Sequence, residues 1–421
     1  MARVTLAELL EGEAPRTSTE VAGWLRARRD LGGVTFGLLR DRTGRVQLVD
    51  REGHLSQLPL ETVISVSGAL RAEARAPGGW ELVVERVDVL NRVEGVPWVP
   101  ERSMPQDLEE QLRHRILTLR DEPVMRVFRL QAALGRMFRE TLDALGFTEV
   151  HTPKIVATGT EGGAELFPLD YFGEPAFLAQ SPQFYKEMLV ATGLERVYEV
   201  APVYRAEPHA TRRHLNEYVS LDLEMGYTEA LAELLDLEEH LLEAFRAAAD
   251  AIGFSAGWLL RPPARMSLAE AHDALARRYG KVLAAGHLDP EAERLLCAYV
   301  GGSEAEGAVF VTDWPRAVRP FYAREMPEDP GNTASFDLLA GGMEITTGGL
   351  REHRWERQVA SLTERGLDPT RFGFYLDPFR WGMPPHGGMA VGLEHLTIMT
   401  AGLDNVRQAT LFPRDRGRLS P

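Results

Sequence analysis

The segment RVYEVAPVYRAEPHATRRHLNEYVSLDLEMGY carries the residues with the clearest chemical potential. In it, Arg205 and Glu207 lie on one face of a predicted strand, followed by a loop rich in arginine and histidine and by a returning strand. Two strands joined by a basic loop can hold a triphosphate. An isolated Arg-x-Glu is usually an ion pair of little energetic value. The hypothesis of an anion site therefore depends on the residues around this pair.

Several other kinds of chemistry are excluded. The sequence has no G-x-G-x-x-G behind a strand, no G-x-x-x-x-G-K-[ST] and no H-E-x-x-H, so a Rossmann site, a P-loop and a zinc protease are not supported. Cys297 is the single cysteine, which excludes a disulfide framework and a Cys-rich metal site. The N-terminus lacks the apolar core of a signal peptide, and no run of apolar residues could span a membrane. We expect a cytoplasmic protein without a membrane partner.

The charge distribution is uneven along the chain. The 421 residues carry a net charge of -15, which at first argues against nucleic acid, because Lys and Arg supply most phosphate binding. Residues 21–51, however, hold seven arginines against three aspartates. This basic segment is a candidate anion contact within an acidic protein.

The elements that would position these residues form two domains. Residues 20–92 show short alternating segments separated by glycine-centred turns, which is typical of a five-stranded OB-fold barrel. Residues 1–92 are therefore expected to be a binding domain, and the proline-containing stretch 93–121 a hinge. Residues 122–421 contain an amphipathic helix over 123–145, several strands in irregular order, and a helical insertion around 229–305. The expected fold class is α+β, with a mixed, mainly antiparallel sheet flanked by helices.

Three blocks, FTEVHTP, YRAE with RRHLNE, and GLEHL, resemble motifs 1, 2 and 3 of the class II aminoacyl-tRNA synthetases in order and spacing. The longer blocks ATGTEGGAELF, FLAQSPQFYKEMLVATGLERVYEVAPVYRAE and GMPPHGG are similar to aspartyl-tRNA synthetases of the archaeal type, whose OB-fold reads the anticodon. The resemblance extends from about Val21 to Pro421. It implies that aspartate attacks the α-phosphorus of ATP to give aspartyl-adenylate, and that the aspartyl group then passes to tRNA.

The resemblance implies a role for each matching residue. Arg205 would contact the α-phosphate, Glu207 would accept from the adenine amino group, Tyr218 would stack on adenine, and Arg213 and His214 would lie by the phosphates or the tRNA end. Asp337, Glu344 and Thr347 would hold Mg²⁺ with ATP, and Glu344 would thereby also bind ATP. The implied aspartate site comprises Glu161, Ser181, Gln183, Lys186, Asp222 and Arg351.

Within that site, the resemblance assigns the side-chain carboxylate of aspartate to Lys186 and Arg351. We expect this pair to reject asparagine, because a neutral amide would leave two cations uncompensated. Asparagine is therefore the weaker candidate substrate.

The sequence departs from the family at two positions. The arginine that ends motif 3 and grips the γ-phosphate is His395 here, and Leu350 replaces the glutamine of GGQREH. We still assign His395 to the catalytic and ATP-binding set. The departures leave room for a paralogue with altered motif 3, acting either as a small-molecule ligase that makes asparagine or as a tRNA binder that does not charge.

The barrel positions that match the family's anticodon contacts are Arg26, Arg29, Phe36, Gln47 and Pro77. Relatives restricted to tRNA-Asp carry a tryptophan where Arg26 stands and a lysine where Pro77 aligns, so we expect charging of both tRNA-Asp and tRNA-Asn. The alternative is that Arg26 itself reads the third anticodon base. The resemblance also implies a homodimer formed through motif 1, with an apolar helix face to bury, and a tRNA-dependent amidotransferase as a partner for the second product.

Overall fold

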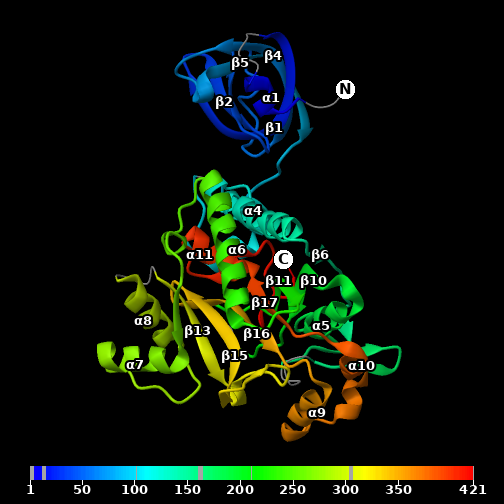
Figure 1. Cartoon of the computed structure of the whole chain (residues 1–421). Helices are drawn as coiled ribbons and strands as arrows, with labels where there is room; N and C mark the ends of the chain where they lie inside the picture. The colour runs from blue at the N-terminus through cyan, green and yellow to red at the C-terminus, as the bar shows by residue number, and fades with distance from the viewer. Residues whose placement is uncertain are drawn as a thin grey trace. The chain divides into compact units, whose positions relative to one another are not determined.

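The computed structural model describes residues 4–11, 16–100, 102–159, 165–209, 211–302 and 307–420. By internal contacts the chain divides into two units, Met1–Thr118 and Leu119–Pro421 (Figure 1). The division falls inside the segment predicted as a hinge. None of the helices in the described ranges is long and apolar enough to span a bilayer.

The first unit is a closed five-stranded barrel with the strand order β1-β2-β3-β5-β4. Alternating burial along β2 shows why these residues form strands, since every second side chain enters the barrel core. The predicted OB-fold architecture is confirmed. Its strands are β1 (Arg16–Leu31), β2 (Val34–Arg40), β3 (Arg45–Asp50), β4 (Val63–Ala72) and β5 (Trp80–Asn91), followed by the helices α2 (Leu108–Arg113) and α3 (Arg115–Thr118).

A short helix, α1 (Leu6–Leu10), closes the barrel by burying Leu6 and Leu9 in its core. Five residues are too few for a helix to persist alone. Asp41 fastens it, because Oδ2 accepts from the Leu6 amide at 3.0 Å while Oδ1 accepts from the Thr43 and Gly44 amides. Helix α1 therefore depends on one carboxylate of the barrel.

The second unit is built on a large mixed sheet with the order β12-β13-β15-β16-β17-β11-β10-β6, to which β14 adds beside β15. All its pairings are antiparallel except β12 with β13 and β10 with β6. The predicted α+β class is confirmed. The strands are β6 (Thr148–Glu149), β10 (Arg196–Tyr204), β11 (Glu217–Gly226), β12 (Ala264–Ser267), β13 (Ala308–Pro315), β14 (Glu325–Met326), β15 (Asp329–Ala340), β16 (Met343–Arg351) and β17 (His386–Gly392).

Helices α4 (Glu122–Ala144), α6 (Leu231–Ala251) and α11 (Leu393–Ala401) pack on one another and on the sheet (Figure 1). Leu134 and Phe138 of α4 meet Phe245 of α6 and Leu221 of β11 in the largest core cluster. The apolar face of α4 is therefore covered by its own chain, so the premise that this face needs a partner subunit is wrong.

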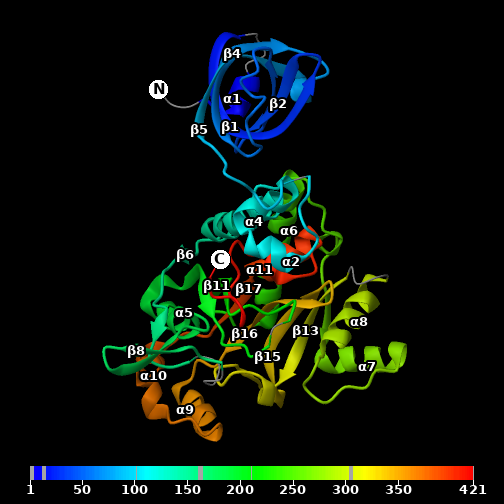
Figure 2. The same cartoon turned by 180° about the vertical axis from the view of Figure 1, so that it is seen from behind.

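The remaining elements surround the sheet. Helices α7 (Leu268–Tyr279) and α8 (Pro290–Gly301) lie beside β13, as both views show (Figure 2). The insertion expected to be helical also contributes β12, which joins the main sheet parallel to β13. The other elements are a small sheet of β7 (Ile155–Val156), β8 (Pro168–Tyr171) and β9 (Glu174–Leu178) and the helices α5 (Gln183–Leu189), α9 (Trp355–Glu364) and α10 (Gly373–Gly382).

Replacing Asp41 by alanine should detach α1 from the barrel. Three backbone amides would lose their acceptor, and leaving such donors unsatisfied costs about 1–3 kcal/mol. We expect faster hydrogen exchange at the Leu6 and Ala7 amides and a lower denaturant midpoint. Asp30→Ala, which removes an exposed acceptor of the Thr35 hydroxyl, is the matched control. Unchanged exchange at Leu6 in Asp41→Ala would contradict this account.

Candidate active site

One large cavity, with a volume of about 770 Å³, lies within the second unit. Its lining comes from strands β11, β15, β16 and β17, from helices α5, α8 and α11, and from loops that include the basic loop after β10. It brings together most of the residues that the sequence singled out: Ser181, Gln183, Lys186, Arg205, Glu207, Arg213, His214, Tyr218, Asp222, Glu344, Thr347, Arg351 and His395. Glu161 lies outside the described residues.

The hairpin of β10 and β11 positions the predicted adenine and phosphate contacts. Val203 pairs with Tyr218 across the hairpin, so Arg205, just after β10, comes to lie with its guanidinium 5.8 Å from the Tyr218 ring centroid. Glu207 follows on the same side and also lines the cavity. A cation, an aromatic face and a carboxylate thus occur together as a nucleotide site requires.

The basic loop is fastened by a residue that the sequence did not single out. Arg213 donates from Nη1 to Glu293 Oε2 at 2.7 Å and from Nη2 to the Gly342 carbonyl at 2.8 Å. Glu293 belongs to α8, far away in the sequence, and no local pattern links it to the loop. The Thr211 hydroxyl meets His214 Nδ1 at 2.5 Å.

His395, at the start of α11, is half-buried and lines the cavity. Its Nε2 lies 2.9 Å from the Arg213 carbonyl. Burial lowers the pKa of His395, although hydrogen bonds to the Arg213 and Glu344 carbonyls act in the opposite direction. The hydrogen bond from Nε2 to the Arg213 carbonyl links α11 to the basic loop.

The predicted metal ligands lie on two paired strands. Asp337 of β15 is directly opposite Thr347 of β16, and Glu344 lies opposite the nearby Leu339. The Glu344 side chain faces the cavity. Desolvation by the surrounding protein raises the pKa of its carboxyl group, and the negative charge of Asp337 acts in the same direction. Asp337 Oδ1 is buried without a hydrogen-bond partner in the described ranges. This unsatisfied oxygen and a raised carboxyl pKa are what a cation would relieve, so the residues fit Mg²⁺.

Arg319, which was not predicted from the sequence, lies beside the candidate metal ligands. It donates from Nη2 to Asp337 Oδ2 at 2.6 Å and from Nη1 to the Thr347 hydroxyl at 3.3 Å, with its guanidinium 4.4 Å from the Trp314 ring. The only sequence signal for this residue was its position directly before Pro320, a few residues after a predicted strand. Among the described residues no three His, Cys, Asp or Glu side chains gather as a metal site, so Mg²⁺ would need phosphate oxygens as further ligands.

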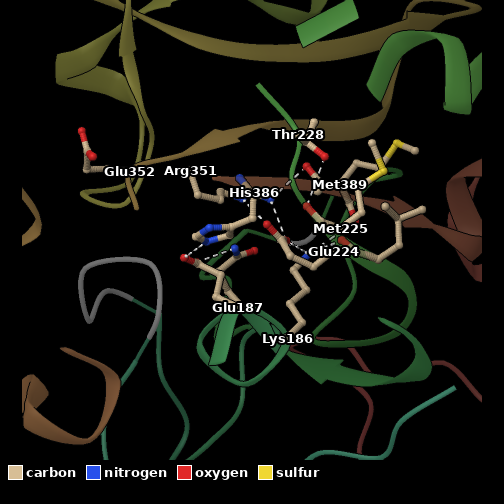
Figure 3. A network of polar contacts seen from close by, with 12 residues as sticks. Lys186, Glu187, Glu224, Met225, Thr228, Arg351, Glu352, His386 and Met389 are labelled. Atoms are coloured by element: carbon tan, nitrogen blue, oxygen red, sulfur yellow. Dashed lines mark hydrogen bonds and ion pairs between the residues drawn. The ribbon is translucent and has the colours of Figure 1, made fainter. Parts of the chain in front are cut away.

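Two cations and two carboxylates form a buried quartet, Lys186, Asp222, Glu224 and Arg351. All but Glu224 line the cavity, and Figure 3 shows Lys186, Glu224 and Arg351 close together. Lys186 Nζ donates to Asp222 Oδ1 at 3.0 Å and lies 3.5 Å from Glu224 Oε2. Arg351 Nε donates to Glu224 Oε1 at 3.1 Å. Burial opposes the charge on Arg351, but Glu224 raises its pKa above the usual value.

Gly388 of β17 makes room for the quartet. A Cβ at this position would lie 2.1 Å from Glu224 Oε2 and 2.3 Å from the Leu223 carbonyl. The Gly388 carbonyl also accepts from Arg351 Nη2 at 2.9 Å. The last glycine of GMPPHGG thus has a steric role that its sequence position alone did not reveal.

The quartet corrects one expectation. Lys186 and Arg351 are not two uncompensated cations, because Asp222 and Glu224 neutralise them before any ligand enters. The argument that asparagine would leave two bare cations is therefore wrong. What remains is an unsatisfied acceptor, since Asp222 Oδ2 is buried without a hydrogen-bond partner in the described chain.

The predicted anticodon residues lie on the barrel. Arg29 of β1 pairs with Phe36 of β2, and Gln47 of β3 pairs with Leu38, which places all three on the outer face. Gln47 Nε2 donates to Glu81 Oε2 at 2.9 Å. Pro77 is exposed in the turn before β5.

Arg26 does not share this outer surface. Its side chain is 4% exposed, pairs with Glu61, and donates from Nη2 to the Pro100 carbonyl at 3.1 Å. The alternative that Arg26 reads a base is therefore contradicted by its burial.

Comparison with known proteins places this geometry in a family. Residues 107–416 match the model for tRNA synthetases class II (D, K and N), and residues 19–90 match that for the OB-fold nucleic acid binding domain. The chain is 48% identical to the aspartate--tRNA(Asp/Asn) ligase of Thermus thermophilus, over 96% of each chain. It is 43% identical to the ligase of the same name from Aeropyrum pernix, over 95% of each chain.

A solved structure shares the whole architecture. Asparaginyl-tRNA synthetase from Pyrococcus horikoshii, complexed with asparaginyl-adenylate, covers 100% of each chain with a TM-score of 0.92 at 32% identity. The chain belongs to the class II tRNA synthetases, in the family of archaeal-type aspartyl-tRNA synthetases.

Proposed function

We propose that the protein ligates L-aspartate to tRNA at the expense of ATP, through aspartyl-adenylate. The proposal rests on the polar groups of the quartet where it borders the cavity. There, Asp222 Oδ2 is an unsatisfied acceptor for the α-ammonium group, close to the Lys186 and Arg351 cations that suit a carboxylate. The names of the full-length relatives support aspartate as the amino acid.

The first reaction step takes place between the bound aspartate and the bound ATP. The α-carboxylate of aspartate attacks the α-phosphorus of ATP, the bond to the β-phosphate oxygen breaks, and pyrophosphate leaves. Arg205 neutralises charge that develops on the α-phosphate, while Tyr218 and Glu207 hold adenine. In the second step a hydroxyl of the terminal adenosine attacks the aspartyl carbonyl, and AMP leaves.

Asp337, Glu344 and Thr347 would hold Mg²⁺ with ATP, and the ion would supply charge neutralisation at the phosphates. Glu344 opens into the cavity and so lies where phosphate oxygens can share the ion. Arg319 keeps the charge of Asp337 balanced in the protein alone.

We also propose that the enzyme charges both tRNA-Asp and tRNA-Asn. The two anticodons differ in the third base, and discrimination needs a group that leaves something unpaired with the wrong base. Arg26 is buried and Pro77 has no side-chain hydrogen-bonding group, so neither residue supplies it. The relatives named for both tRNAs are consistent with this proposal, and a cytoplasmic tRNA-dependent amidotransferase would then convert the mischarged product.

Two activities test the proposal together. We expect aspartate-dependent pyrophosphate exchange, and aspartylation of both purified tRNAs with kcat/KM values within about tenfold of each other. Arg205→Ala should lower exchange by about 10²–10³, because it removes a stabilising cation from the transition state. Arg246→Ala, which removes a surface partner of Asp250, is the control.

Each negative result has a distinct meaning. Exchange without transfer would favour the small-molecule ligase, and tRNA binding without exchange would favour the non-charging binder. A preference for tRNA-Asp of a hundredfold or more, about 2.7 kcal/mol, would contradict dual charging alone. The full-length similarity, barrel included, favours the charging enzyme over both alternatives.

We propose a homodimer on the resemblance of motif 1 to its class, not on the apolar face of α4, which is already covered. Sedimentation at micromolar protein should give about twice the chain mass of 46.9 kDa. A stable monomer at that concentration would refute the proposal.

His395→Arg should lower the KM for ATP or leave activity intact. An arginine has five donors, so it can keep the bonds to the carbonyls of Arg213 and Glu344 and still present a permanent cation to the γ-phosphate. ATP-dependent exchange kinetics at saturating aspartate measure the effect. A large loss of activity would show instead that the site is adapted to histidine.

A further inference from the structure

A buried hydrogen-bond network lies next to the quartet and is centred on Glu187 of α5 (Figure 3). Glu187 accepts from Gln183 Nε2 at 2.7 Å, from the Tyr375 hydroxyl at 2.8 Å and from His386 Nε2 at 3.0 Å. The Tyr375 hydroxyl in turn accepts from Gln358 Nε2 at 3.1 Å. Both oxygens of a fully buried carboxylate are thus satisfied by donors from three different elements.

His386 is held as an imidazolium by this geometry. Its Nε2 faces a carboxylate, and its Nδ1 lies 2.8 Å from the Pro384 carbonyl, so both nitrogens must donate. Burial opposes this charge, but Glu187 raises the pKa of His386, with Glu224 acting in the same direction. Arg351 is its cross-strand partner. The same contacts outweigh burial at Glu187 and lower its pKa.

The network fixes the orientation of the Gln183 amide. A carboxylate can only accept, so the side of Gln183 that meets Glu187 must be its NH₂ group. The carbonyl oxygen Oε1 is therefore left for a ligand, and Gln183 and Asp222 both line the cavity. If residue 187 could donate, the amide would be free to turn its NH₂ group toward the cavity instead.

We propose that Glu187, held by Tyr375 and an imidazolium at His386, is a positioning residue that makes Gln183 present its carbonyl oxygen to the α-ammonium group of the substrate. Gln183 Oε1 and Asp222 Oδ2 then form a pair of acceptors for one cationic group. The inference rests on the proposed function, because it assumes that an amino acid enters this end of the cavity.

The experiment replaces Glu187 by glutamine, which has nearly the same shape but can donate. Aspartate-dependent exchange gives the KM and kcat for aspartate, and inhibition of the same exchange gives the Ki for L-malate, which carries a hydroxyl in place of the ammonium group. We expect the KM for aspartate to rise about tenfold or more at nearly unchanged kcat. The Ki for malate should change less than threefold, because a hydroxyl can pair with either end of an amide.

Two further variants complete the test, one as a second probe of the network and one as a control. Tyr375→Phe removes one of the donors that anchor Glu187. Because a less firmly held Glu187 orients the Gln183 amide less well, the aspartate KM should rise two- to fivefold, again without a matching change for malate. Glu238→Gln makes the same chemical change at another fully buried glutamate, on α6, and should leave both constants unchanged.

Equal weakening of aspartate and malate in Glu187→Gln, or no change in either, would overturn the inference. If Glu187→Gln does not fold, the same comparison in Tyr375→Phe decides. Absence of aspartate-dependent exchange in the unmodified protein would instead refute the proposed function, so the two failures are distinguishable.

Discussion

The quartet of Lys186, Asp222, Glu224 and Arg351 is the constraint on which the rest of the catalytic unit depends. Taking four charges out of water is costly unless each meets an opposite charge and further hydrogen bonds. The fold meets this requirement by placing β16, β17 and β11 side by side, so that Glu224 lies opposite Gly388, and Arg351 lies opposite His386, two residues away along β17. Lys186 reaches these strands from α5.

This neutral arrangement changes how amino acid selection should be understood. A site with two bare cations would select a dicarboxylate by charge alone, whereas a balanced quartet must exchange partners when the ligand enters. Selection between aspartate and asparagine then depends on which protein groups release their partners, and the free acceptor on Asp222 marks where that exchange begins.

The phosphate end shows the complementary arrangement. Asp337 and Glu344 bring negative charge to two adjacent strands, and Arg319 balances part of it while Asp337 Oδ1 remains unsatisfied. The metal-ligand candidates thus have spare capacity for a cation, whereas the basic residues of the quartet are matched by carboxylates. This difference supports the proposed placement of ATP beside the former and of the amino acid beside the latter.

The sequence alone determined the elements whose residues are close along the chain. Alternation defined the barrel strands, amphipathic periodicity defined α4, and the hairpin joining Arg205 to Tyr218 placed the nucleotide contacts, because a short loop brings its two strands together wherever the fold lies. Motif spacing likewise identified the residues that meet in the cavity. These predictions rest on local geometry, which does not need the rest of the molecule.

Only the tertiary structure decided which charges are already paired. Several ion pairs join residues that are far apart in the sequence. They are Lys186 with Asp222, Arg351 with Glu224, Arg213 with Glu293, Arg319 with Asp337, and His386 with Glu187. The burial of Arg26 against Glu61 and the covering of α4 by α6 are of the same kind. Pairing at such separations depends on strand order and register, which no local pattern specifies. The candidate site residues could therefore be identified from the sequence, whereas their charge balance could not.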